Sequence, residues 1–193
     1  CYCFDDIDLK ILEGEYFVMA TSTYKTEILR TSGLKMLEKT FYVDMQYNVV
    51  PMTKVETFTY YHLDIYRYFI GRDDQSVNEK VMIGRIDQQI KVNKLMIDAY
   101  DLTKIKNKKL RDYMVKYLTM MMTVSSVFLI KEGSEESLQK REELWEYLKN
   151  KNKIMYRMIN KMALSKPMQF RSKAGRKIVV WGYSLSQKIY GFN

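Results

Sequence analysis

The chain has 193 residues, of which 47% are hydrophobic and 28% are charged, and its formal net charge is +9. These proportions are typical of a folded globular protein and exclude a chain that is disordered by composition. Two cysteines, Cys1 and Cys3, and one histidine, His62, are too few for a disulfide framework or a cysteine–histidine metal site.

The charge is divided unevenly along the chain. Residues 1–76 carry eight basic and twelve acidic side chains, whereas residues 77–193 carry 24 basic and eleven acidic ones. After Glu146 there are eleven basic side chains and no acidic one. This asymmetry predicts an anionic partner for the C-terminal part, either a membrane surface or another polyanion. Nucleic acid is not expected, because no RNA-reading motif or recognition-helix pattern is present.

Residues 1–76 have the composition of a mixed α/β segment, rich in Thr, Tyr and Val with short amphipathic stretches. A strand or an extended segment is expected over residues 15–23, strands over 55–61 and 64–71, and short helices over 23–33 and 44–50. Thr23 is the expected cap of the first helix, and Asp44 is expected to begin the second, which Pro51 stops.

Residues 77–193 show helical periodicity throughout. Helices are expected over about 78–101 and 107–130, then from Ser134 with a pause at 149–153, and again around residues 155–162 and 178–189. The most apolar stretch, residues 117–130, is shorter than a membrane span and contains hydroxyl residues, so a buried core helix is predicted. The fold class is therefore α+β and mostly helical, with a small α/β part over 1–76 and a basic α-helical domain over 77–193.

Two short segments carry candidate functional residues. In "TFYVDMQY" (40–47), Asp44 stands among aromatic and apolar side chains. It is either a helix-capping aspartate or a general base at an apolar-walled cleft. In "YRYFIGRDDQSVN" (66–78), Arg72 precedes a turn that leads to Gln75 and Ser76 at a helix start. This arrangement suits phosphate binding, and the alternative is a surface turn with a capping serine.

A metal site is not predicted from these residues. Asp6-x-Asp8 has the form of a cation-binding pair, but such a pair follows a buried strand, and only five residues precede Asp6. A solvated loop is the preferred interpretation. No signal peptide is recognised, and because the chain begins with Cys rather than Met, we expect its natural N-terminus to lie upstream.

Three segments in order resemble the second half of bacterial glycosyltransferase family 2 proteins, most closely Firmicute members that build cell-surface polysaccharides. They are "YKTEILR", "LEKTFYVDMQY" and "VETFTYYHLDIYRYFIGRDDQSVN", and the final "KIYGFN" is also similar. The similarity covers most of the chain, is strongest over residues 15–80, and is weak in the helical part.

The resemblance implies an inverting transferase with a GT-A nucleotide-sugar fold. A sugar would pass from a nucleotide-sugar donor to a hydroxyl of a glycan or lipid-linked acceptor. Asp44 would be the general base, while Arg72, Gln75 and Ser76 would bind the donor diphosphate. Val43 departs from the family pattern, which commonly has an acidic residue at that position.

The resemblance also implies that the chain is a fragment. The family's nucleotide-binding half, with the Asp-x-Asp that holds Mg²⁺ or Mn²⁺, has no counterpart in these 193 residues. The chain alone would then be inactive and would bind no metal. A different interpretation is a non-catalytic basic helical module that binds an anionic membrane surface or polymer. On either interpretation we expect a cytoplasmic protein, with peripheral association at the inner face of the cell membrane as the further expectation.

Overall fold

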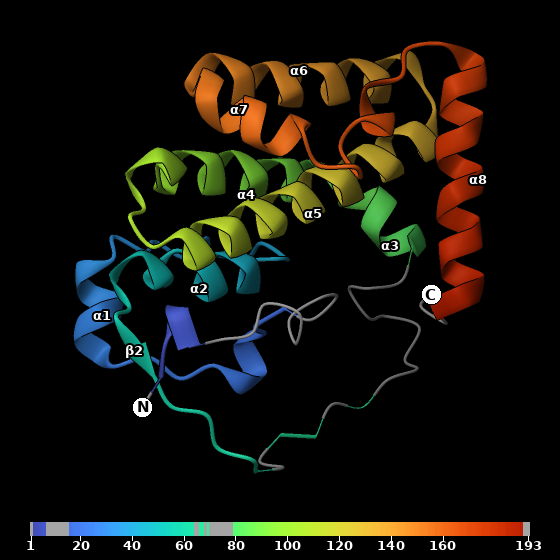
Figure 1. Cartoon of the computed structure of the whole chain (residues 1–193). Helices are drawn as coiled ribbons and strands as arrows, with labels where there is room; N and C mark the ends of the chain where they lie inside the picture. The colour runs from blue at the N-terminus through green and yellow to red at the C-terminus, as the bar shows by residue number, and fades with distance from the viewer. Residues whose placement is uncertain (1, 7–15, 64–65, 68, 70–78, 191–193) are drawn as a thin grey trace.

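The computed structural model describes residues 2–6, 16–63, 66–67, 69 and 79–190, and it is mostly helical (Figure 1). Two short strands, β1 (Tyr2–Cys3) and β2 (Thr57–Phe58), pair antiparallel with Tyr2 opposite Phe58. The α-helices are α1 (Thr26–Thr31), α2 (Asp44–Val49), α3 (Glu79–Gly84), α4 (Ile86–Ala99), α5 (Lys108–Glu132), α6 (Glu135–Lys151), α7 (Lys153–Asn160) and α8 (Lys173–Tyr190). The 3-10 helices are η1 (Phe4–Asp6), η2 (Met19–Thr21), η3 (Pro51–Lys54), η4 (Leu102–Lys104) and η5 (Pro167–Gln169). The mostly helical α+β class is thereby confirmed.

Residues 15–23, predicted as a strand or an extended segment, form no strand where the structure describes them, although Val18 and Ser22 have extended backbone. Residues 16–18 have no regular structure, and η2 follows them. The backbone N–H of Phe17 instead donates to the Tyr113 hydroxyl of α5, at 3.0 Å. A side chain therefore satisfies this backbone group where a neighbouring strand would otherwise be needed. The strand predicted over 55–61 shortens to β2, and most of the strand predicted over 64–71 lies outside the described residues.

Both short helices of the N-terminal segment form, with one difference at a cap. Helix α1 begins after Lys25 and has no side-chain cap, so the prediction that Thr23 caps it is wrong. Gly33 follows α1 with a φ of 77°, a conformation that glycine adopts without strain. Helix α2 begins at Asp44, as predicted, and Pro51 opens η3 directly after it.

The helix predicted over about 78–101 is broken in two. Helix α3 ends at Gly84, and Arg85 leaves helical geometry at φ −118° and ψ 19° before α4 begins. Glycine has a low helix propensity, which favours a break at this point.

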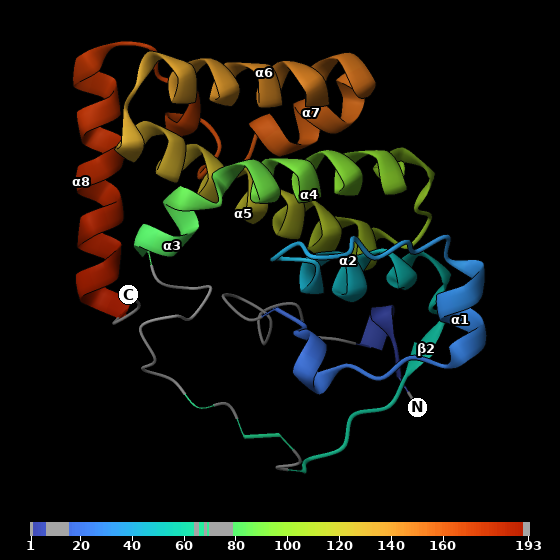
Figure 2. The same ribbon diagram turned by 180° about the vertical axis from the view of Figure 1, so that it is seen from behind.

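Helix α5 is the central element of the helical part. Its N-cap is Asn107, whose side chain accepts from the Leu110 N–H at 2.9 Å, and Gly133 ends it with a φ of 79°. By length and composition α5 could cross a membrane, but 78% of its most apolar window is buried inside the protein. This burial agrees with the core helix predicted over residues 117–130. Figures 1 and 2 show α4, α6 and α7 lying alongside α5, while α8 crosses one end of this group.

Capping side chains set the limits of α6 and α7. The Ser134 hydroxyl accepts from the Ser137 N–H at 3.1 Å, which confirms the predicted start of α6. The predicted pause at 149–153 is confirmed at Asn152, whose side chain accepts from the N–H groups of Ile154 and Met155, each at 3.0 Å. Within the bundle, the Trp145 indole N–H donates to the buried Ser126 hydroxyl of α5 at 3.0 Å.

Candidate functional site

The turn before α2 has an unusual backbone conformation. Lys39 and Tyr42 both have positive φ, 50° and 67°, which is unfavourable for residues with a side chain. The first turn of α4 holds this turn in place. The Phe41 backbone N–H donates to Gln88 Oε1 at 2.9 Å, and the Arg85 guanidinium lies 3.8 Å from the centre of the Phe41 ring. The turn is therefore fixed by residues more than forty positions away in the sequence.

Asp44 follows this turn as the first residue of α2, and its side chain is exposed. The protein around the carboxylate removes part of its hydration, and this raises its pKa above the ordinary value of 3.8. Hydrogen bonds from the backbone N–H groups of Asp44 and Met45 oppose the shift but do not cancel it. The arrangement yields a positioned carboxylate that is open to solvent and a better proton acceptor than an ordinary aspartate.

Tyrosine side chains lie near Asp44 and hold α2 in place. The negative charge of Asp44 raises the pKa values of Tyr42 and Tyr117, where burial is the larger cause in both cases. The Tyr24 hydroxyl donates to the backbone oxygen of Asn48 at 2.8 Å, and the Tyr24 ring meets Tyr47 edge-on at 5.3 Å.

The buried side of α2 is polar. The side-chain amide of Asn48, only 1% exposed, donates to the Tyr117 hydroxyl at 3.3 Å. Two buried oxygens, Asn48 Oδ1 and Gln46 Oε1, have no hydrogen-bond partner among the described residues. Polar groups of this kind are costly in a core that serves packing alone. They make the buried side of α2, the helix that Asp44 begins, partly polar.

The structure places one of the four predicted site residues. Asp44 is at the predicted helix start, whereas Arg72, Gln75 and Ser76 lie outside the described residues. The resemblance implies a divalent metal ion. The described part of the chain has no group of three His, Cys, Asp or Glu side chains that could bind such an ion. We therefore assign no step to a metal within this chain.

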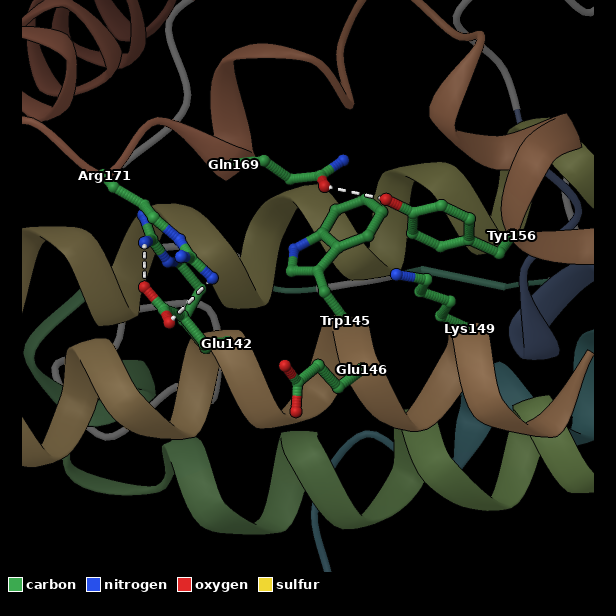
Figure 3. Close-up of a pocket in the computed structure, with 8 residues that line it drawn as sticks. Glu142, Trp145, Glu146, Lys149, Tyr156, Gln169 and Arg171 are labelled. Carbon is green, nitrogen blue, oxygen red and sulfur yellow. Dashed lines mark hydrogen bonds and ion pairs between the residues drawn. The ribbon is translucent and has the colours of Figure 1, made fainter. Parts of the chain in front are cut away.

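A cavity of about 140 Å³ lies elsewhere, between α6, α7 and the segment after η5 (Figure 3). At its edge, Glu142 lies between two guanidinium groups, with its oxygens 3.5 Å from Arg141 Nη2 and 3.2 Å from Arg171 Nη2. Arg141 is 2% exposed, and it also donates to the Phe170 backbone oxygen at 2.9 Å. Burial and the neighbouring arginines lower its pKa, while Glu142 opposes this.

The opposite wall of this cavity is also internally bonded. The Tyr156 hydroxyl donates to Gln169 Oε1 at 3.0 Å (Figure 3), and the Gln169 amide in turn donates to Asn160. Most of these polar groups bond to one another. We therefore interpret this region as a structural junction that joins the segment between α7 and α8 to α6. The junction was not predicted from the sequence. The adjacent opposite charges of Arg141 and Glu142 are the only local feature of the sequence that points to it.

No protein-family model, curated protein or solved structure matches this chain.

Proposed function

We propose that this chain supplies the acceptor side of an inverting glycosyltransferase, with Asp44 as the general base. The observation that carries the proposal is the exposed Asp44 carboxylate with a raised pKa, set at the start of α2 by a turn with unfavourable backbone geometry. Strained backbone is typical of functional sites, where contacts from the surrounding structure maintain it. The order of the three resembling segments supports the same assignment.

The proposed step is a direct displacement. An acceptor hydroxyl gives its proton to the Asp44 carboxylate as its oxygen bonds to the anomeric carbon of the donor sugar. The bond from that carbon to the nucleoside diphosphate breaks, and the diphosphate leaves with the electron pair. Attack from the face opposite the leaving group inverts the configuration. A positioned carboxylate contributes about 10²- to 10⁴-fold to such proton transfers.

The leaving diphosphate would be bound by Arg72, Gln75 and Ser76, as the resemblance implies. A cation and two polar groups in that segment can stabilise the charge that develops on the leaving oxygen. The nucleotide-binding part and its Mg²⁺ or Mn²⁺ would belong to chain outside these 193 residues. The donor sugar and acceptor would then serve the synthesis of a cell-surface polysaccharide.

The test uses the complete reading frame that contains this chain. Release of nucleoside diphosphate is measured with a panel of nucleotide sugars and cell-surface polysaccharide as acceptor. Asp44→Asn is expected to lower kcat by a factor of about 10² or more, because the base is lost while the amide keeps its shape. Glu38→Gln, an exposed carboxylate in the same turn region, is the matched control and is expected to leave kcat unchanged.

Two outcomes would remove the proposal. One is an Asp44→Asn protein that keeps the activity of the Glu38→Gln control. The other is a complete protein that transfers no sugar from any donor of the panel.

A further inference from the structure

The outer face of α8 carries a row of large apolar side chains, here named the outer stripe: Ile178, Trp181, Leu185 and Ile189. Their exposed fractions are 59%, 68%, 41% and 66%, respectively. At about 100° per residue these positions fall on one side of the helix. A single exposed apolar residue is ordinary in a folded protein, but a contiguous row marks a surface that binds something.

The opposite side of α8 already provides its contact with the body of the protein. Val179 is buried, and the Tyr183 ring meets Phe128 of α5 edge-on at 5.8 Å. The Gln187 amide donates to Glu79 Oε2 of α3 at 3.5 Å. Helix α8, which lies at one end of the helical group (Figures 1 and 2), is thus held in place without the outer stripe, whose side chains remain exposed.

A row of cations borders the outer stripe on one flank. Lys173, Lys177 and Lys188 are exposed, and their helical positions lie between the stripe and the packed face. Within the described part of the chain, no carboxylate forms an ion pair with any of these three lysines. An open hollow beside them is lined by both kinds of surface, the apolar Val180 and Trp181 and the basic side chains.

We propose that α8 lies in the headgroup region of an anionic lipid bilayer. The outer stripe would enter the boundary between headgroups and acyl chains, and the three lysines would face lipid phosphates. A helix with lysines along one flank and tryptophan and aliphatic residues on its exposed side has the composition of interfacial membrane helices. Trp181 fits this depth because its indole combines an apolar body with a polar N–H.

Charge decides between a bilayer and a second copy of the chain. Two copies that pack stripe against stripe would bring their lysine rows together, and residues 147–193 contain no carboxylate to offset the repulsion. An anionic lipid surface can contact the apolar outer stripe and the three lysines at the same time. This inference does not depend on Asp44 or on glycosyl transfer.

The test mixes the 193-residue chain with vesicles of phosphatidylcholine alone, or with about 30 mol% phosphatidylglycerol, a content that gives a negative surface. Trp145 is buried and Trp181 exposed, so a change in tryptophan emission on binding reports on α8. We expect a blue shift with the anionic vesicles, weakened by added salt, and little change with phosphatidylcholine alone.

The first variant removes the charges of Lys173, Lys177 and Lys188 by changing each to Gln. It is expected to lower the vesicle partition coefficient on the order of 100-fold, because each lysine at a membrane surface contributes about fivefold and the three factors multiply. The secondary structure should not change, since all three side chains are exposed.

The matched control changes Lys25, Lys35 and Lys54 to Gln. These three lysines are also exposed, and the substitutions remove the same net charge from the N-terminal segment. The control is expected to bind anionic vesicles within a few-fold of the unmodified chain, because charges beyond about 10 Å from the surface are screened.

A second pair of variants tests the outer stripe. Ile178→Ser with Leu185→Ser is expected to abolish the blue shift, whereas Ile154→Ser with Leu164→Ser, equally exposed but on other elements, should retain it. Circular dichroism checks that both remain helical. If the stripe variant unfolds, the lysine variant and its control decide alone.

Three results would overturn the proposal. The first is equal binding to both kinds of vesicle. The second is an equal loss of binding in the two lysine variants. The third is a concentration-dependent dimer without vesicles, seen by sedimentation and lost when Ile178 and Leu185 become Ser, since a second copy would then cover the stripe.

Discussion

The N-terminal segment and the helical part are stabilised in different ways. Among the described residues, five core side chains come from before residue 77 (Phe4, Tyr42, Val49, Val50 and Met52), whereas 26 come from α3 onward. The N-terminal segment instead relies on tyrosine hydroxyls that bond to backbone groups, and much of its support comes from α4 and α5. A segment with so small a core of its own can hold strained geometry only because a larger domain holds it.

The largest expected effect is a difference in unfolding free energy between core substitutions in the helical part and in the N-terminal segment. Leu118 is fully buried in α5, and the substitution Leu118→Ala is expected to lower the unfolding free energy by about 2–5 kcal/mol. Val49, also fully buried in α2, loses fewer carbon atoms when it is changed to Ala, and this substitution is expected to cost about 1–2.5 kcal/mol. Urea unfolding measures both. The comparison fails if Val49→Ala destabilises the protein more than Leu118→Ala does.

A second prediction compares the effect on stability of changing each of two glycines of α8 to alanine. A Cβ at Gly175 would lie 2.7 Å from Phe170 Cβ, so Gly175→Ala is expected to lower stability by about 1–3 kcal/mol. A Cβ at Gly182 would meet nothing within 4 Å, so Gly182→Ala should raise stability by about 0.5–1 kcal/mol through helix propensity. Thermal unfolding of both proteins checks the signs, and a shared sign would contradict the packing assigned to α8.

The smallest expected effect concerns the polar N-terminal segment. The pKa of Asp44 is higher in the folded protein than its ordinary value, so ionising this carboxylate opposes folding. Its favourable contribution is complete below the unfolded pKa, near 3.8, and is lost as pH rises through the raised pKa. Asp44→Asn should therefore increase stability at neutral pH relative to the unmodified chain, and the advantage should shrink toward about pH 3.

Urea unfolding at the two pH values measures this difference between the proteins. A destabilising effect of Asp44→Asn at neutral pH would mean that the hydrogen bonds to the carboxylate outweigh its loss of hydration. Asp44 would then be a structural helix-start residue.

The sequence predicted local features well where one or two side chains determine them. The start of α6 was predictable because the short polar side chain of Ser134 satisfies a free N–H group there, and the start of α2 at Asp44 and the pause at 149–153 were predicted as well. Features that join distant residues were not predictable. The Gln88 contact with Phe41, the junction of Arg141 with Phe170, and the side-chain bond that replaces a strand at Phe17 depend on tertiary packing.

The apolar stripe of α8 illustrates a different limit. The spacing of Ile178, Trp181 and Leu185 predicted an amphipathic helix, and the helix is present. Spacing describes which residues share a side, but it does not say whether that side faces a core. Only the packing of Val179 and Tyr183 against α5 shows that the stripe faces outward.

The break between α3 and α4 links the geometry of Asp44 to that of a distant helix. Arg85 occupies the break and covers the Phe41 ring, and Gln88, one turn later, holds the Phe41 backbone. The turn that positions Asp44 therefore depends on the backbone conformation at the α3–α4 break and not on its own residues alone.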